Sequence, residues 1–178
     1  YLDGTYAGTW TITPFSESGT YTLSSFFVAD EAGNTKYYTT DELNTLGIQT
    51  TMEVTGGASD TTDPNLISYD LSSYDIDLSN GDYVINVEAR ITDDISGVFD
   101  GTYANGSGGS ASQARWTSPS GEQFLDAGYF DNPNSGTYLD GTYVGTTTLD
   151  QYAETGTWTL SLFLVADEAG NTRYYTPD

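Results

Sequence analysis

The chain contains no cysteine and no histidine among its 178 residues. A disulfide framework is therefore excluded, and so is a zinc site built from Cys and His side chains. The same absence removes the usual nucleophile–base pairs of hydrolases, in which a Ser or Cys works beside a His. An enzyme is therefore not expected. Paired carboxylates can hydrolyse a glycoside on their own, but no pair stands out among the many Asp and Glu residues.

Basic residues are scarce. Four Lys and Arg stand against 26 Asp and Glu, which gives a formal net charge of −22. Such a chain is repelled by the phosphates of nucleic acids and by anionic membrane surfaces, so neither is an expected partner. The excess negative charge also opposes compaction of the chain. We therefore expect divalent cations to offset part of it.

Long apolar runs are missing as well. No stretch reaches the roughly 18 apolar residues that a membrane-spanning helix needs. The sequence begins without Met and without a signal peptide, so we expect a mature or excised segment. High net charge can indicate disorder. Here 15 Tyr, 7 Phe and 3 Trp lie in patterned segments, which favours a folded core.

The clearest feature that is present is an internal repeat. Residues 1–41 return as residues 138–178 without a gap, and 28 of the 41 positions are identical. The period of 137 residues suits one domain per repeat. We expect residues 1–58 to form the rear part of one repeat. Residues 59–178 would form most of the next repeat, without its closing strand.

Alternation of apolar and polar residues predicts an all-β chain. Residues 74–78 and 83–91 alternate on either side of Asn80 and Gly81, a pattern typical of a hairpin. A further strand is predicted over residues 158–166, and we expect Trp158 and every second residue after it to face inward. The corresponding strand of the first copy covers residues 21–29. Both faces of this strand are apolar near its end, so we expect a central strand.

One short helical turn is predicted over residues 40–46. A capping residue precedes acidic residues, Leu43 and Leu46 are three positions apart, and Gly47 follows. Residues 48–54 then indicate a closing strand, 56–59 a linker at the repeat boundary, and 105–112 a flexible loop. Short strands separated by turn residues favour tandem immunoglobulin-like β-sandwiches that lack the usual disulfide.

Acidic motifs stand at three places beside the predicted strands. Residues 60–64 lead into the second repeat, 92–98 follow one strand, and 167–171 follow another and recur at 30–34. In a sandwich with Greek-key order, these segments meet at one pole. Oxygen ligands suit Ca²⁺. The sequence therefore predicts a calcium site whose ligands are Asp60, Asp63, Asp93, Asp94, Asp167 and Asn171, with a remnant formed by Asp30 and Asn34.

The alternative is that these residues are only turn formers on a charged surface. Asp, Asn and Gly are preferred in any tight turn. None of the motifs is an EF-hand loop, which would carry its own ligand spacing. The calcium interpretation has one physical advantage, because so many carboxylates in one place repel one another unless a cation lies between them.

Three sequence elements carry a resemblance to a known class. The Asp-rich entry before Pro64, DDISGV after a strand and VADEAGNT before the last strand resemble bacterial immunoglobulin-like or cadherin-like tandem repeats. The resemblance covers residues 59–178 and part of 1–55. It implies a large secreted protein of the bacterial cell surface, acting as adhesin, stalk or filament, with calcium at domain junctions. The repeat is longer than a minimal domain of this class, and residues 100–137 stay unexplained.

Two further interpretations stay open. The aromatic residues Trp116, Tyr129 and Phe130 lie in the long insert, where exposed rings would stack on a surface glycan and make the chain a carbohydrate-binding module. Aromatic residues on strands more often pack inward. Self-assembly into filaments is the other possibility, because residues 48–54 of one molecule could fill the gap of a missing strand in a neighbour. A segment cut from a longer chain is the simpler explanation of that gap.

Overall fold

A computed structural model of the chain describes residues 3–102 and 112–176. These residues form short antiparallel sheets and one helix, so the predicted all-β character is confirmed. The predicted helical turn is α1 (Thr40–Thr45). Its N-terminus has a capping box, in which Thr39 accepts from the Glu42 backbone and the Glu42 side chain accepts from Thr39. No helix in the described part of the chain is long and apolar enough to cross a membrane.

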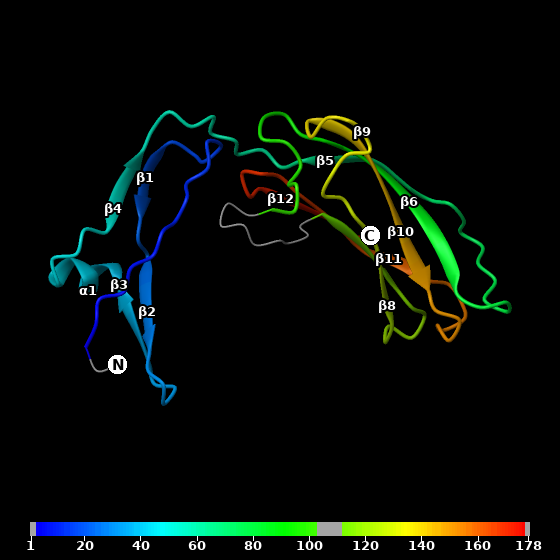
Figure 1. The fold of residues 1–178 in the computed structure, drawn as a ribbon, viewed down its shortest axis with the longest axis horizontal. Coiled ribbons are helices and arrows are strands. Elements are labelled where there is room, and N and C mark those ends of the chain that lie inside the picture. The colour runs from blue at the N-terminus through cyan, green and yellow to red at the C-terminus, as the bar shows by residue number, and fades with distance from the viewer. Residues whose placement is uncertain (1–2, 103–111, 177–178) are drawn as a thin grey trace.

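Residues 3–58 contain two separate strand pairs. Strand β1 (Gly19–Thr22) pairs with β4 (Thr51–Val54), and β2 (Ser25–Ala29) pairs with β3 (Thr35–Thr39). In Figure 1 these strands stand apart from those of the rest of the chain. The strand predicted over residues 21–29 is interrupted, because β1 ends at Thr22 and β2 begins at Ser25. Leu43 is the only buried apolar side chain of this region among the described residues.

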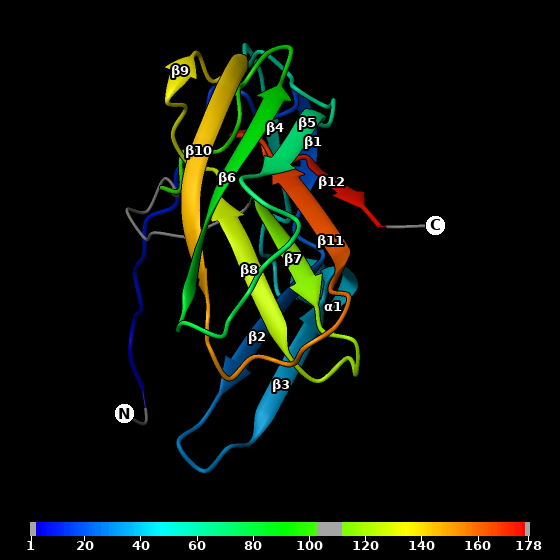
Figure 2. The same cartoon turned by 90° about the vertical axis from the view of Figure 1, so that its right-hand side faces the viewer.

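Residues 59–102 and 112–176 form two four-stranded sheets (Figure 2). One has the strand order β5 (Asn65–Leu71), β6 (Tyr83–Thr92), β10 (Asp140–Leu149) and β9 (Ser135–Gly136). The other has the order β12 (Thr172–Tyr175), β11 (Thr159–Ala166), β7 (Gln113–Thr117) and β8 (Phe124–Tyr129). All pairings within these sheets are antiparallel.

Both of these sheets contribute side chains to one core. Every second residue of β6 is buried, as alternation along a strand requires. From the other sheet, Phe163 stacks on Phe130 with ring centroids 5.5 Å apart, and Tyr69 meets the Phe163 ring edge-on. The buried cluster consists of Ile85, Val87, Ala89, Ile91, Val98, Ala114, Ala127, Phe130, Tyr143, Leu149, Phe163 and Val165. Residues 3–58 contribute nothing to it.

The predicted hairpin around Asn80 is wrong. Strand β6 pairs with β5 and β10, and residues 72–82 form a loop. Ser and Asp side chains in this loop bind nearby backbone groups, for example Asp77, which accepts from the Ser79 amide at 2.9 Å. Such local bonds compete with a strand ladder. Ile76 and Leu78 still pack against the core, so the apolar pattern reports burial but not a strand.

The predicted inward row of β11 is correct only in its first part. A bulge between Leu160 and Leu162 shifts the pairing with β7. A single extra residue reverses which side chains face inward. Trp158 and Leu160 pack on the core before the bulge, whereas Phe163 and Val165 are fully buried after it.

The predicted linker at residues 56–59 is held in place by hydrogen bonds. Ala58 donates to the Pro14 carbonyl at 2.8 Å, and Ser18 donates to the Ser59 hydroxyl at 3.0 Å. A Cβ at Gly57 would lie 2.5 Å from the Ser16 carbonyl oxygen, so this close approach requires glycine. The predicted flexible loop at 105–112 lies outside the described residues, except for Ser112. That hydroxyl is buried and accepts from the Ala166 amide.

Candidate metal site

Three carboxylates meet where the chain enters the larger region. Asp60, Asp93 and Asp94 each offer an oxygen, and these oxygens lie within 4.8 Å of one another. The strand pairing explains the meeting. Asp60 precedes β5 and the other two follow β6, and the antiparallel register places Asn65 opposite Thr92. The start of one strand therefore lies beside the end of the other.

Asp60 is the buried member of this three-carboxylate group, with 4% of its surface exposed. Its Oδ2 accepts from the Ser96 amide at 2.8 Å, and its Oδ1 accepts from the Thr62 amide and hydroxyl, both at 3.1 Å. Burial by itself would raise the pKa of Asp60, but the hydrogen bonds from Ser96 and Thr62 outweigh it. The net effect lowers the pKa below 3.8 and keeps this carboxylate charged at neutral pH.

Asp93 has one carboxylate oxygen without a hydrogen-bond partner among the described residues. Its Oδ2 accepts from the Gly97 amide at 2.7 Å and from the Ile95 amide at 3.2 Å, which folds the loop after β6. The oxygen without a partner is Oδ1, which is buried, and the buried Ser96 hydroxyl also has no partner in the described part of the chain. A buried carboxylate oxygen without a partner costs free energy. A bound cation would remove that cost.

Asp94 forms the exposed side of the group, so solvent reaches it from there. The Thr62 hydroxyl donates to Asp94 and thus links the loop after β6 to the chain entry. Charged carboxylates this close together repel one another. Neither ion pair of the described residues involves the group, because Arg90 pairs with Asp140 and Arg115 with Asp126. The arrangement suits a hard cation with oxygen ligands.

The turn at residues 167–171 lies next to this group. Asp167 accepts from the Asn171 amide at 2.8 Å and from its side-chain nitrogen at 2.7 Å. The same Asn171 nitrogen donates to the Asp60 carbonyl oxygen at 3.3 Å. Burial raises the pKa of Asp167, and the charge of Asp60 adds to this, against the hydrogen bonds from Asn171. The three predicted motifs therefore converge.

The predicted ligands divide into three sets. Asp60, Asp93 and Asp94 form the group, whereas the carboxylate of Asp167 is turned toward its own loop and bound by Asn171. Asp63 is exposed and outside the group. The remnant at residues 30 and 34 forms the same turn, with bonds of 2.8 and 2.7 Å, but on an exposed surface away from other predicted ligands. A ligand role for residues outside the group stays a prediction.

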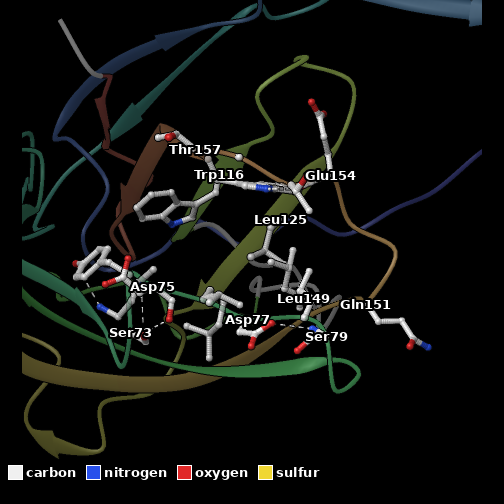
Figure 3. A pocket seen from close by; sticks show the side chains of 18 residues that line it. Ser73, Asp75, Asp77, Ser79, Trp116, Leu125, Leu149, Gln151, Glu154 and Thr157 are labelled. Carbon is white, nitrogen blue, oxygen red and sulfur yellow. Dashed lines mark hydrogen bonds between the residues drawn. The ribbon is translucent and has the colours of Figure 1, made fainter.

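Sequence reasoning missed Thr62, which binds both Asp60 and Asp94. The sequence signal for Thr62 is its position two residues after Asp60. An Asp side chain commonly accepts a hydrogen bond from the backbone amide two residues further along the chain. It also missed a cavity of about 820 Å³ between residues 71–79 and 154–158 (Figure 3). Trp116 lines this cavity, and its indole nitrogen donates to the Tyr69 hydroxyl at 3.1 Å.

The aromatic residues of the insert have three different environments. Phe130 belongs to the core, Trp116 is half-buried at the cavity, and Tyr129 is exposed. A shared aromatic platform for a sugar ring is therefore absent from these three residues.

In comparisons with known proteins, no family model matches the chain, and no curated protein or solved structure matches it significantly.

Proposed function

We propose that this chain is part of an extracellular structural or adhesive protein of a bacterial cell surface. It would consist of tandem immunoglobulin-like repeats stiffened by calcium, serving as stalk, adhesin or filament component. Repetition of a domain-sized unit supports length and multivalency rather than catalysis. The core shared by two antiparallel sheets is compatible with an immunoglobulin-like sandwich.

The position of Asp60 carries this proposal. Its backbone amide donates to the Phe15 carbonyl at 3.1 Å, which ties it to the first region. Its carboxylate lies in the three-carboxylate group with Asp93 and Asp94 of the second region. A cation bound there would hold the loop after β6 against the junction. Binding would therefore stiffen the connection between successive repeats.

The chemistry of the group favours Ca²⁺ over other metals. All ligands on offer are oxygens, and the chain has no His or Cys to attract zinc. Calcium takes six to eight oxygens in flexible geometry. It therefore tolerates a mixture of carboxylates, the Ser96 hydroxyl and water better than Mg²⁺, which demands a near-ideal octahedron.

Thermal melting with about 2 mM Ca²⁺ or with EDTA tests the proposal, since extracellular calcium modules bind at about 10⁻⁴–10⁻³ M. Binding only to the folded state adds about 2.7 kcal/mol when calcium exceeds its Kd a hundredfold, and about 0.6–1.8 kcal/mol at the roughly two- to twentyfold excess expected here, because the gain follows the logarithm of the excess. Asp93→Asn removes a charge from the group and should abolish most of the calcium response. Asp77→Asn removes the same charge from the exposed loop before β6, away from all predicted ligands, and should leave the response intact.

Two outcomes would refute the calcium site. The first is a melting temperature that calcium leaves unchanged. The second is an equal loss of the calcium response in Asp93→Asn and Asp77→Asn, which would show general screening of the negative charge. Isothermal titration of both variants distinguishes binding from screening.

Carbohydrate binding is the second candidate. The cavity with Trp116 and Trp158 in its lining supports it, because indole rings stack on sugar faces. A glycan array with the whole chain tests this candidate. Binding that Trp116→Ala abolishes while melting stays cooperative would favour it over the structural role.

A further inference from the structure

Three buried side-chain oxygens lack a hydrogen-bond partner among the described residues. They are Asp93 Oδ1, the Ser96 hydroxyl and the Tyr143 hydroxyl. The first two belong to the loop after β6, whereas Tyr143 lies in β10, the strand beside β6. Buried polar atoms without a partner are rare in folded proteins, and each one calls for an explanation. A cation at the three-carboxylate group accounts for the two loop oxygens and leaves the Tyr143 hydroxyl without a role.

The register of β6 and β10 places Tyr143 and Asp93 on the same face of their sheet. Tyr143 lies opposite Ala89. Asp93 comes directly after β6, and its amide still donates to the Leu139 carbonyl of the facing chain at 2.9 Å. Because alternate residues of a strand share a face, Asp93 continues the inward row of Ala89 and Ile91.

A glycine lets the Tyr143 ring lean toward Asp93. Gly141 lies between Tyr143 and the end of the strand pair where Asp93 follows. A Cβ at Gly141 would lie 3.0 Å from Cε2 of Tyr143, so the far end of the ring covers this glycine. Cε2 is bonded to the ring carbon that carries the hydroxyl. The hydroxyl of Tyr143 is therefore directed along the sheet toward the calcium site.

The electrostatics of Tyr143 agree with this direction. Burial raises the pKa of Tyr143, and the nearby Tyr138 and the charge of Asp93 raise it further. The hydroxyl thus lies near the Asp93 carboxylate, although no hydrogen bond joins them directly. Tyr143 is 1% exposed, and Phe130 meets its ring edge-on with centroids 6.3 Å apart. The hydroxyl therefore has no access to bulk solvent.

We propose that Tyr143 is a positioning residue of the calcium site: its hydroxyl donates through one buried water to Asp93 Oδ1 and holds this oxygen toward the ion. Buried waters commonly link polar groups that have no other partner. A carboxylate oxygen has two lone pairs, so Oδ1 accepts from the water and binds the cation at the same time. The amides of Ile95 and Gly97 hold the other oxygen. This inference rests on the proposed calcium site and adds a residue of the neighbouring strand to it.

The bond matters for affinity because it fixes a metal ligand from behind. Loss of such an outer partner typically costs about 10–100-fold in metal affinity. Tyr143 also belongs to the buried cluster shared by the two sheets. Its hydroxyl would therefore connect the bound ion to the core of the second region as well as to the loop after β6.

Tyr143→Phe tests the proposal, since it removes the hydroxyl and keeps the ring in the core. We expect the calcium concentration that gives half of the full stabilisation to rise about tenfold. The melting temperature in EDTA should stay unchanged or rise, because the hydroxyl has no protein partner to lose. Calcium titrations followed by thermal melting at constant ionic strength measure both quantities.

Tyr69→Phe is the matched control, because Tyr69 packs against the same core. Its hydroxyl accepts from the Trp116 indole nitrogen at 3.1 Å and donates to the Ala127 carbonyl at 3.4 Å. Both partners lie outside the calcium site. Tyr69→Phe should therefore lower the melting temperature in EDTA and leave the calcium affinity unchanged. The two variants separate a role in the site from a role in the fold.

A spectroscopic signature supplements the affinities. The near-ultraviolet absorption of tyrosine responds to the surroundings of its hydroxyl, and a bound cation changes the field at Tyr143. Calcium should therefore alter this absorption in the natural chain and in Tyr69→Phe, but not in Tyr143→Phe. An unaltered calcium difference spectrum in Tyr143→Phe would contradict the assignment.

Natural calcium affinity in Tyr143→Phe, while Asp93→Asn still abolishes the response, would overturn this inference and leave the calcium site intact. An equal loss of calcium affinity in Tyr69→Phe would also overturn it, because the effect would then come from the core in general. Absence of any calcium response in the natural chain would overturn the calcium site together with the role of Tyr143.

Discussion

The two copies of the repeat share most of their sequence and differ in what surrounds them. Phe163 is fully buried, whereas its counterpart Phe26 is 49% exposed, although both are Phe in the same strand context. Strand β11 has β7 beside it and packs into the core of two sheets, whereas β2 has β3 as its single partner among the described strands. Local sequence therefore determines the strand and its hairpin. The segments that pack on it determine whether its apolar face becomes a core.

The turn at the end of each hairpin sharpens this contrast. The sequence Asp-Glu-Ala-Gly-Asn makes the same two Asp–Asn hydrogen bonds in both copies, at 2.8 and 2.7 Å. Hydrogen bonds from Asn34 lower the pKa of Asp30, which is exposed. Burial raises the pKa of Asp167, which has only 2% of its surface exposed. The same turn sequence thus shifts the pKa of its Asp in opposite directions in the two environments.

Truncation of Phe163 and of its counterpart Phe26 should give the largest difference in stability between the two copies. Phe163→Ala leaves a cavity beside Phe130 and Tyr69, and a buried Phe→Ala costs about 3–5 kcal/mol of unfolding free energy. Phe26→Ala should cost below about 1 kcal/mol, because that ring already meets solvent. Urea unfolding followed by tryptophan fluorescence measures both. Equal losses would mean that the first copy acquires a core of its own in solution.

Sequence patterns predicted those features of the chain that depend on neighbouring residues. The helix at residues 40–45 and a strand that ends at Val54 are confirmed. The hairpin around Asn80 failed because β6 finds better partners far along the chain in β5 and β10. The bulge in β11 could not be predicted from the alternation of apolar and polar residues, because both faces of that strand are apolar.

The candidate site was predictable to the level of motifs, not of atoms. Greek-key reasoning brought the chain entry and the loops at residues 92–98 and 167–171 together, and they do meet. Which oxygens point inward depends on side-chain bonding that the sequence does not encode locally. Asn171, for example, uses its amide to bind Asp167 and the Asp60 backbone.

The opposite pKa shifts predict opposite pH dependences for the two turns, measured in EDTA. The lowered pKa of Asp30 contributes stability above pH 3.8 that is lost as pH falls through its folded pKa. The raised pKa of Asp167 contributes stability below pH 3.8 that is lost as pH rises through its folded pKa. Relative to the natural chain, Asp167→Asn should therefore gain stability as pH rises, and Asp30→Asn should lose it.

Unfolding free energies of both variants between about pH 3 and 7 test this, together with NMR titration of the two carboxyl groups. If Asp167 titrated below Asp30, its burial beside Asp60 would not persist in solution. If Asp30 and Asp167 had the same pKa, the turn at Asp30 would be buried in solution as the turn at Asp167 is, which would require a partner that covers the first copy.

The smallest predicted effect concerns the basic residue that follows each turn. Arg173 donates to Asn65 at the start of β5 and lies 5.4 Å from the centre of the Tyr175 ring. Lys36, its counterpart, lies 4.3 Å from the centre of the Tyr38 ring. Among the described residues this contact stays within the β2–β3 hairpin. Arg173→Lys should cost up to about 1 kcal/mol, because a lysine reaches the ring but not both partners together. Lys36→Arg should change stability by no more than a few tenths of a kcal/mol. Equal effects of the two exchanges, measured by thermal melting, would show that Arg173 does not connect β12 to β5. The difference between the copies would then arise from apolar burial alone.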